Sequence, residues 1–155
     1  MTPSGNEYPR EIVTIEKATD DAPETRVVTV VNDEYEERGV LAAMAYMTAW
    51  NVTTLRTCLN YPHARVGGGG RLLVTEQADE MPDDFFERFS QRERWNRTCW
   101  ETREVSQSSQ DKVHLRIQFT RYRADGSLIG RYPSIWIMTN QDGHWAIKMR
   151  SSFAA

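Results

Sequence analysis

Three histidines have the side chains whose ordinary pKa lies closest to neutral pH, so they are the first candidates for proton transfer. His63 follows Pro62 where a strand is expected to begin, and its ring either takes part in chemistry or caps the turn. His114 lies on the polar side of a predicted strand and His144 follows a hairpin turn, so both are expected to face solvent or an interface. The three are scattered without the local spacing of metal ligands, and we predict no bound metal and no other cofactor.

A glycine run at residues 67–70 and two cysteines are the other local features that could carry chemistry. The glycines lack the Lys-Ser/Thr pair and the following helix of a phosphate-binding loop, so we interpret them as the tip of a hairpin. Cys58 and Cys99 form no metal or redox motif. Cys58 is predicted to be a small core residue, whereas either Cys99 or its neighbour Trp100 points inward.

Two hydroxyl side chains lie beside apolar stretches. Tyr46 is at the edge of the apolar stripe of a predicted helix, close to Trp50. Its hydroxyl either bonds to a backbone carbonyl at the protein boundary or donates a hydrogen bond into a pocket. Ser151 is polar on an otherwise apolar strand face, so it meets either a ligand or a buried carbonyl.

Composition limits the class of protein. The chain has 155 residues, 39% of them hydrophobic, with five tryptophans and a net charge of −3. These values favour one globular domain and exclude bulk affinity for nucleic acid or membranes. The start is polar without a secretion-type apolar segment, and the longest apolar run is too short to cross a bilayer. We therefore expect a cytoplasmic protein.

Charge is distributed unevenly. Residues 1–40 are acidic, whereas residues 112–155 are basic and contain only the carboxylates Asp125 and Asp142. We expect an acidic N-terminal arm over residues 1–31, partly ordered, with short strands at residues 11–15 and 26–31 and with residues 1–8 mobile. The arm is either solvated or packed on the basic C-terminal third.

The pattern becomes helical after Asn32. Asp33 and Glu36 have the spacing of a capping box. The helix that follows has one apolar face, formed by Val40, Ala43, Met44, Met47 and Trp50. A second, short helix is expected around Leu55, and Pro82 marks the first turn of a third helix that carries Phe85, Phe86 and Phe89.

The remaining chain is predicted to be strand. Asp125-Gly126 and Asp142-Gly143 are strong hairpin signals, so the last three strands form an antiparallel meander. One face of this sheet is apolar, and the other is basic and polar. The strands are expected at residues 64–66, 71–75, 98–106, 113–123, 128–139 and 144–153, and the apolar face at Val113, Leu115, Ile117, Phe119, Trp145, Ile147, Met149, Ser151 and Phe153.

Three segments are similar to a known superfamily. Residues 45–51 (AYMTAWN) and the short helix ending at Cys58 and Leu59 resemble the opening of the nuclear-transport-factor-like superfamily, which includes SnoaL-like polyketide cyclases and ketosteroid isomerases. Residues 119–126 (FTRYRADG) and 142–153 (DGHWAIKMRSSF) resemble the closing strands of SnoaL-like domains. The resemblance implies a SnoaL-like domain over residues 32–155, with an α+β cone of helices packed in a strongly curved antiparallel sheet. It also implies an apolar pocket at the open end.

The resemblance does not extend to isomerase chemistry. Ketosteroid isomerases pair a carboxylate base with a tyrosine and a protonated acid. Tyr46 matches the tyrosine of the family, but residues 61–68 and 132–139 contain no carboxylate where the base and the acid are expected. His63 lies close to the position of the missing base, where a neutral imidazole could serve.

Three functional hypotheses follow. The favoured one is binding of a small apolar ligand in the cone, at Tyr46, Trp50, His63, Leu115, Ile117, Phe119, Ile147, Met149 and Ser151. The second is an enzyme of isomerase, cyclase or dehydratase type, in which Tyr46 and His63 carry out enolate or proton-transfer chemistry. The third is a protein-interaction module without a ligand, which uses a basic outer sheet face at Arg116, Arg121, Arg123, Lys148 and Arg150. We also expect a homodimer through that outer face, which is predicted to carry Trp, Tyr and Arg.

Overall fold

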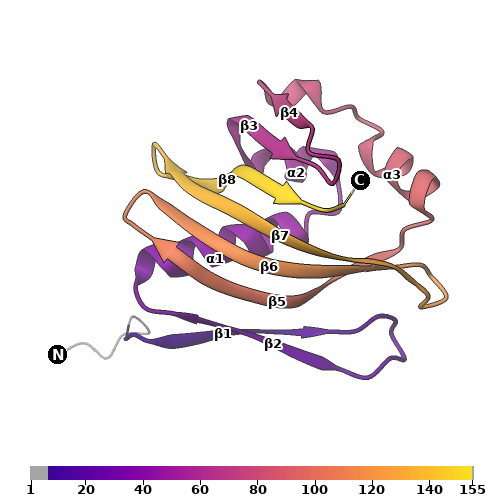
Figure 1. Cartoon of the computed structure of the whole chain (residues 1–155), viewed down its shortest axis with the longest axis horizontal. Coiled ribbons are helices and arrows are strands. Elements are labelled where there is room, and N and C mark those ends of the chain that lie inside the picture. The colour runs from indigo at the N-terminus through magenta and orange to yellow at the C-terminus, as the bar shows by residue number, and fades with distance from the viewer. Residues whose placement is uncertain (1–6, 155) are drawn as a thin grey trace.

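The computed structural model describes residues 7–154 as helices packed on a curved sheet (Figure 1). The elements in chain order are β1 (Arg10–Glu16), β2 (Thr25–Val31), α1 (Glu34–Met47), α2 (Val52–Thr57), β3 (Leu59–Val66), β4 (Leu72–Thr75), a 3-10 helix (Ala78–Glu80), α3 (Phe85–Glu93), β5 (Arg97–Ser108), β6 (Lys112–Tyr122), β7 (Leu128–Gln141) and β8 (His144–Ser152). This arrangement confirms the α+β class. Within the described range, no helix is long and apolar enough to cross a membrane.

The main sheet has six strands in the order β4-β3-β8-β7-β6-β5. The last three strands form the predicted antiparallel meander, and β5 extends it by pairing with β6. Asp142 and Gly143 make the turn between β7 and β8 with positive φ angles of 53° and 88°. The glycine run at residues 67–70 connects β3 to β4, as the hairpin prediction required. One difference is that β3 pairs with β8 in parallel, so the sheet is mixed rather than wholly antiparallel.

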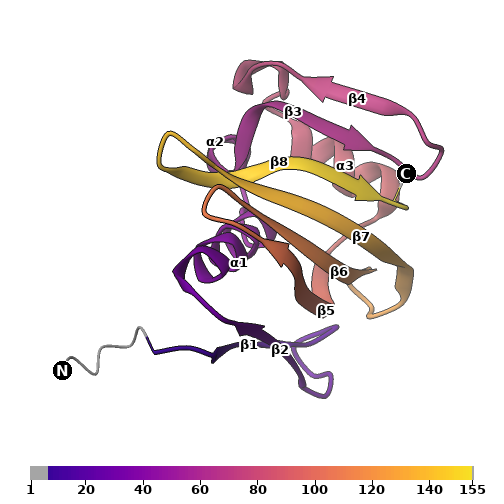
Figure 2. The ribbon, with the colours of Figure 1, turned by 60° about the vertical axis from the view of Figure 1, so that its left-hand side comes forward.

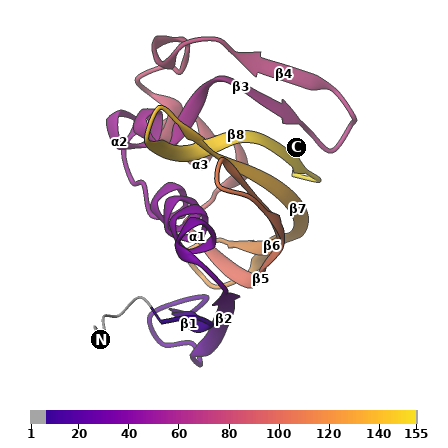
Figure 3. The same ribbon diagram turned by 90° about the vertical axis from the view of Figure 1, so that its left-hand side faces the viewer.

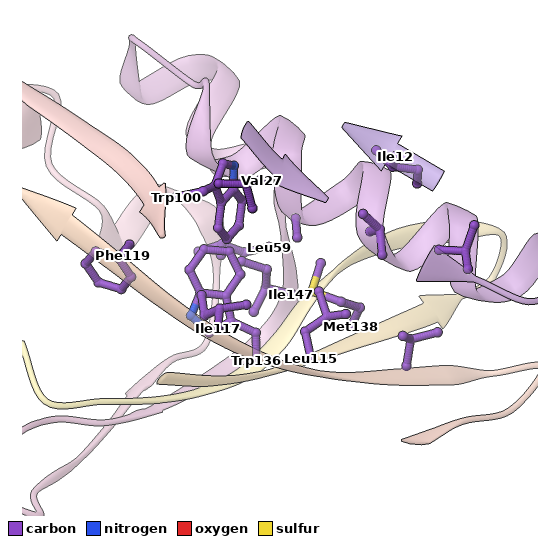
Figure 4. Packing of buried hydrophobic residues seen from close by; sticks show 14 of the residues in the cluster. Ile12, Val27, Leu59, Trp100, Leu115, Ile117, Phe119, Trp136, Met138 and Ile147 are labelled. Carbon is purple, nitrogen blue, oxygen red and sulfur yellow. The ribbon is translucent and has the colours of Figure 1, made fainter. Parts of the chain in front are cut away.

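Helix α1 lies along one face of the sheet (Figure 3). The Asp33 carboxylate accepts a hydrogen bond of 2.8 Å from the Glu36 N–H and so begins the helix where predicted. Gly39 allows close approach to the sheet, because a Cβ at that position would lie 2.8 Å from Val113 Cβ. Figure 4 shows the resulting core, whose central side chains are Trp100, Leu115, Ile117, Trp136, Met138 and Ile147.

The N-terminal region is a hairpin of β1 and β2 that lies beside β5 and the start of α1 (Figure 2). Its inner residues Ile12, Val27 and Val31 belong to the same core as the main sheet. Glu16 accepts a 2.8 Å hydrogen bond from Trp100 N, and Asp20 accepts one of the same length from Arg97. Two acidic residues of this region thus bond to β5, and the hairpin covers that edge of the sheet.

A buried arginine joins the hairpin to β5. Arg103 is 2% exposed and donates hydrogen bonds to Thr29 Oγ1 at 2.6 Å and to Thr14 Oγ1 at 3.3 Å. Its guanidinium also lies 4.9 Å from the centre of the Trp100 ring. Residues 1–6, where most of the mobile segment was predicted, lie outside the described residues, whereas Tyr8 donates a 2.6 Å hydrogen bond to Glu37 in α1.

The inward face of β6 is as predicted, but that of β8 is not. Val113, Leu115, Ile117 and Phe119 are all buried. On β8, Ile147 pairs with Met138 and Met149 with Ile137, which leaves Lys148 as a β-bulge. The bulge reverses the alternation, so Ile147 is buried while Met149 is 41% exposed. The prediction that Met149, Ser151 and Phe153 share the apolar inner face is therefore wrong.

The outer face also differs from the prediction. Arg121 continues the alternation of Phe119 and points inward, and the β8 bulge turns Arg150 inward as well. Trp136 and Tyr132 on β7 pack in the core. The outward residues include an apolar group instead, formed by Leu72, Val74, Ile135, Met149 and Phe153.

Candidate functional site

A cavity of about 430 Å³ lies between the inner sheet face, the end of α1 and α3. A smaller cavity of about 240 Å³ adjoins it. Tyr46, Arg65 and Arg150 belong to the walls of both, and Leu73 on the edge strand β4 also lines both. The larger volume falls within the range of small-molecule sites.

Aromatic rings make up most of the larger cavity's wall. Helix α3 places Phe85, Phe86 and Phe89 on one side, because Phe89 follows the other two by four and three positions, and residues at these spacings are neighbours on a helix surface. Trp95, just after α3, lies 5.2 Å from Phe89 and 6.5 Å from Trp50, measured between ring centres. The cluster gives an apolar ligand a large surface on which to pack.

Tyr46, His63 and Arg150 form a polar group at the junction of the two cavities. The Arg150 guanidinium donates to the Tyr46 hydroxyl through Nη1 and to His63 Nε2 through Nε, the latter at 3.3 Å. It also lies 5.0 Å from the centre of the Tyr46 ring. Tyr46 acts as an acceptor here, so its own proton can be donated to a ligand oxygen.

His63 is 2% exposed and lines only the smaller cavity. Burial, together with the nearby charges of Arg150, Arg65 and Lys148, lowers the pKa of His63 to about 3. The ring is therefore neutral at physiological pH and accepts a hydrogen bond from Arg150. Because a good general base has a pKa near the working pH, this environment argues against His63 in that role.

Four arginines from different elements contribute to the larger cavity's wall: Arg65, Arg92, Arg121 and Arg150. Among the described residues that line this cavity there is no Asp or Glu. Arg65 donates a 2.9 Å hydrogen bond to the Ala154 carbonyl. Burial lowers the pKa of both Arg65 and Arg121, and the charge of Arg150 lowers that of Arg65 further. The wall is thus electropositive.

The predicted site residues fall into three groups. Tyr46, Trp50 and Phe119 line the larger cavity, and His63 lines the smaller one. Leu115, Ile117 and Ile147 are buried in the core and line neither cavity. Met149 and Ser151 are on the opposite sheet face because of the bulge, and Ser152 takes the inward position.

Sequence reasoning missed the contribution of α3 and of the arginines. The helix itself was predicted, but its Phe residues were not assigned to a site. Strict alternation from Phe119 would have placed Arg121 inward, so that signal was present in the sequence. Within the described chain, no group of three His, Cys, Asp or Glu side chains is arranged to hold a metal ion.

Comparisons with known proteins bear on the fold. No protein-family model matches the chain, and neither does any curated protein. A ketosteroid isomerase-like protein from Erwinia carotovora atroseptica superposes with a TM-score of 0.57 and 21% identity, over 77% of this chain and 95% of that one. A Nostoc punctiforme domain of unknown function with a cystatin-like fold gives a TM-score of 0.62 at 11% identity, over 80% of both chains.

An NTF-2-like protein of unknown function from Shewanella oneidensis gives a TM-score of 0.56 at 13% identity, over 76% of this chain and 97% of that one. Identities this low carry information about the fold and none about the reaction or ligand. The chain therefore has the cystatin-like α+β fold that these ketosteroid isomerase-like and NTF-2-like proteins share.

Proposed function

We propose that this protein binds a small molecule with an aromatic or apolar body in the larger cavity. The observation that carries the proposal is a cavity of about 430 Å³ whose wall combines clustered aromatic rings with a few polar groups. Phe85, Phe89 and Trp95 supply the apolar surface, and the Tyr46 hydroxyl supplies a hydrogen-bond donor.

The test is to fill the cavity from its exposed side. Leu73 lines both cavities and lies on the edge strand β4, where it is 43% exposed, so Leu73→Trp adds volume at little cost in stability. The matched control is Leu41→Trp, on α1, where the leucine is 46% exposed and lines neither cavity. Binding of the neutral probe 1-naphthamide is followed by tryptophan fluorescence quenching or by calorimetry.

We expect the wild type and Leu41→Trp to bind the probe with the same dissociation constant and Leu73→Trp to bind it at least about tenfold more weakly. Equal binding by all three proteins would place the probe elsewhere. No binding by the wild type would contradict the proposal.

An enzyme that uses Tyr46 and His63 is the alternative. Both side chains bind Arg150, which supports a shared site for a carbonyl-containing ligand. A proton-abstraction step needs a base, however, and His63 is poorly suited because its pKa is about 3. Binding therefore has more support than proton transfer does. A reaction rate that rises through a pKa near 6.5 and is lost in His63→Gln would reverse this preference.

We also propose that the outer sheet face pairs with a second copy of the chain. Leu72 and Val74 on β4, Met149 on β8 and Ile135 on β7 lie on the outer side of the sheet, and each is more than 40% exposed. An apolar patch of this kind on a sheet face is typical of a protein interface. The sequence predicted Trp and Tyr on this outer face, whereas the exposed apolar residues named here are aliphatic residues and Met.

A further inference from the structure

Resting on the proposed small-molecule site, we infer that the ligand of the larger cavity carries a carboxylate, so that its class is an aromatic or apolar organic acid. Four arginines contribute to the wall of this cavity, and among the residues described no carboxylate does. Arginine is the side chain best suited to hold a carboxylate, because its guanidinium can donate two parallel hydrogen bonds.

Arg121 carries most of this inference. Its side chain is 14% exposed, and its Nη1 is buried with no hydrogen-bond partner among the described residues. The ion pair with Glu93 spans 3.8 Å, which is too long for a hydrogen bond. Buried polar groups without a partner are rare in folded proteins, and a missing ligand is one physical reason for them.

The surroundings of Arg121 hold its guanidinium in place. It lies 4.6 Å from the ring centre of Phe89, 5.3 Å from that of Phe119 and 5.1 Å from that of Tyr132. Stacking on aromatic faces fixes the group without using its N–H donors. Those donors therefore stay available to an anion, at the point where the apolar wall begins.

A second unpartnered donor belongs to the same wall. Trp136 is 2% exposed, and its indole Nε1–H has no hydrogen-bond partner among the described residues. Trp136 and Arg121 both line the larger cavity, although they lie on different strands. The wall therefore contains two hydrogen-bond donors without a partner among the described residues and no acidic acceptor. A ligand with acceptor oxygens would complement such a wall.

Arg150 and Arg65 contribute positive charge to the cavity wall, although N–H groups of both already donate hydrogen bonds within the protein. Arg150 bonds to the neutral acceptors Tyr46 and His63, and Arg65 bonds to a backbone carbonyl. Neither Tyr46 nor His63 is a carboxylate, so these contacts leave the positive charge of Arg150 in place. In a partly buried site such charge favours an anion over a neutral molecule of the same shape.

The experiment compares two probes of nearly equal shape, 1-naphthoate and the neutral 1-naphthamide. We expect the wild type to bind the naphthoate at least about tenfold more tightly, as hydrogen bonds to charged groups allow. Arg121→Met should remove most of this preference and retain binding of the amide. The matched control is Arg116→Met, because Arg116 lies on the outer face with its side chain 71% exposed and paired with Glu104.

Each outcome decides a separate point. Equal binding of the two probes by the wild type would overturn the inference and leave the proposed function standing, whereas no binding of either would overturn both. A preference lost equally in Arg116→Met and Arg121→Met would overturn the placement in the cavity. If Arg121→Met fails to fold, Arg65→Met replaces it, and its binding of 1-naphthamide then shows that the cavity is intact.

Discussion

Arg150 Nε donates a hydrogen bond of 3.3 Å to His63 Nε2, and this contact joins two neighbouring parallel strands, β8 and β3. It exists because the bulge at Lys148 turns Arg150 inward. A guanidinium has no acceptor, so the imidazole must accept and therefore stays unprotonated at Nε2. The group of Tyr46, His63 and Arg150 thus contains a cation bound to a neutral ring, which differs from the proton-transfer pair of the second functional hypothesis.

The buried ring of His63 predicts acid sensitivity. Its pKa is about 3 in the folded chain, against an ordinary value of 6.5, so between these values the unfolded chain binds more protons. The free energy of unfolding contributed by this group is complete above about pH 6.5 and is lost as the pH falls towards 3. The slope is at most about 1.4 kcal/mol per pH unit.

His63→Gln keeps an acceptor for Arg150 and removes this titration. Denaturant unfolding at pH 7.5, 6 and 5 should therefore show the wild type losing stability relative to the variant as the pH falls. A constant difference between the two proteins would contradict the prediction, as would a His63 NMR titration with a midpoint near 6.5.

Tyr46→Phe tests the hydroxyl that faces the cavities. Loss of one hydrogen bond should lower the free energy of unfolding by about 1 kcal/mol and weaken binding of 1-naphthamide several-fold. Tyr61→Phe is the matched control, because Tyr61 donates a 2.7 Å hydrogen bond to the Arg56 carbonyl and lines neither cavity. The control should lose similar stability and keep its affinity. Unchanged affinity in Tyr46→Phe would remove this hydroxyl from the site.

The N-terminal hairpin is predicted to contribute to the stability of the whole domain. Val31 is fully buried against the core, so Val31→Ala should lower the free energy of unfolding by about 2 kcal/mol. Val30 is 50% exposed on the other face of the same strand, and Val30→Ala should change the free energy of unfolding by less than about 0.5 kcal/mol. Chemical denaturation measures both, and equal effects would mean that the hairpin is not packed on the core as described.

If the outer sheet face forms a dimer, a charged substitution in its apolar group should dissociate that dimer. Ile135 is 52% exposed and belongs to the apolar group on that face, so Ile135→Glu should convert a sedimenting dimer into a monomer of about 18 kDa, the 17.9 kDa of one chain. Leu41→Glu places the same charge on the exposed side of α1, which packs against the opposite sheet face, and should leave the dimer intact. A wild type that sediments only as a monomer at micromolar concentration would contradict the proposal.

Local signals were sufficient to predict most of the elements. Asp33 caps α1 where the capping pattern indicated, and the turn at Asp142 and Gly143 closes the last hairpin. The alternation on β6 identified Leu115 and Ile117 as inward residues, and both are buried. These features depend on neighbours in sequence, so the sequence alone specifies them.

The candidate site was less predictable because it depends on long-range pairing. The bulge at Lys148 is a feature of the pairing between β7 and β8, and it places Met149 and Ser151 outside the site. The low pKa of His63 results from burial and from charges on other strands. No local sequence pattern around Pro62 indicates that His63 is buried or that its pKa is low.

The most direct test of the ligand site is a crystal structure of the protein grown with 1-naphthoate. We expect the naphthalene ring in the larger cavity against Phe89 and Trp95, with the carboxylate within hydrogen-bond distance of Arg121. A cavity that stays empty at saturating probe, or a probe bound only on the outer sheet face, would contradict the account.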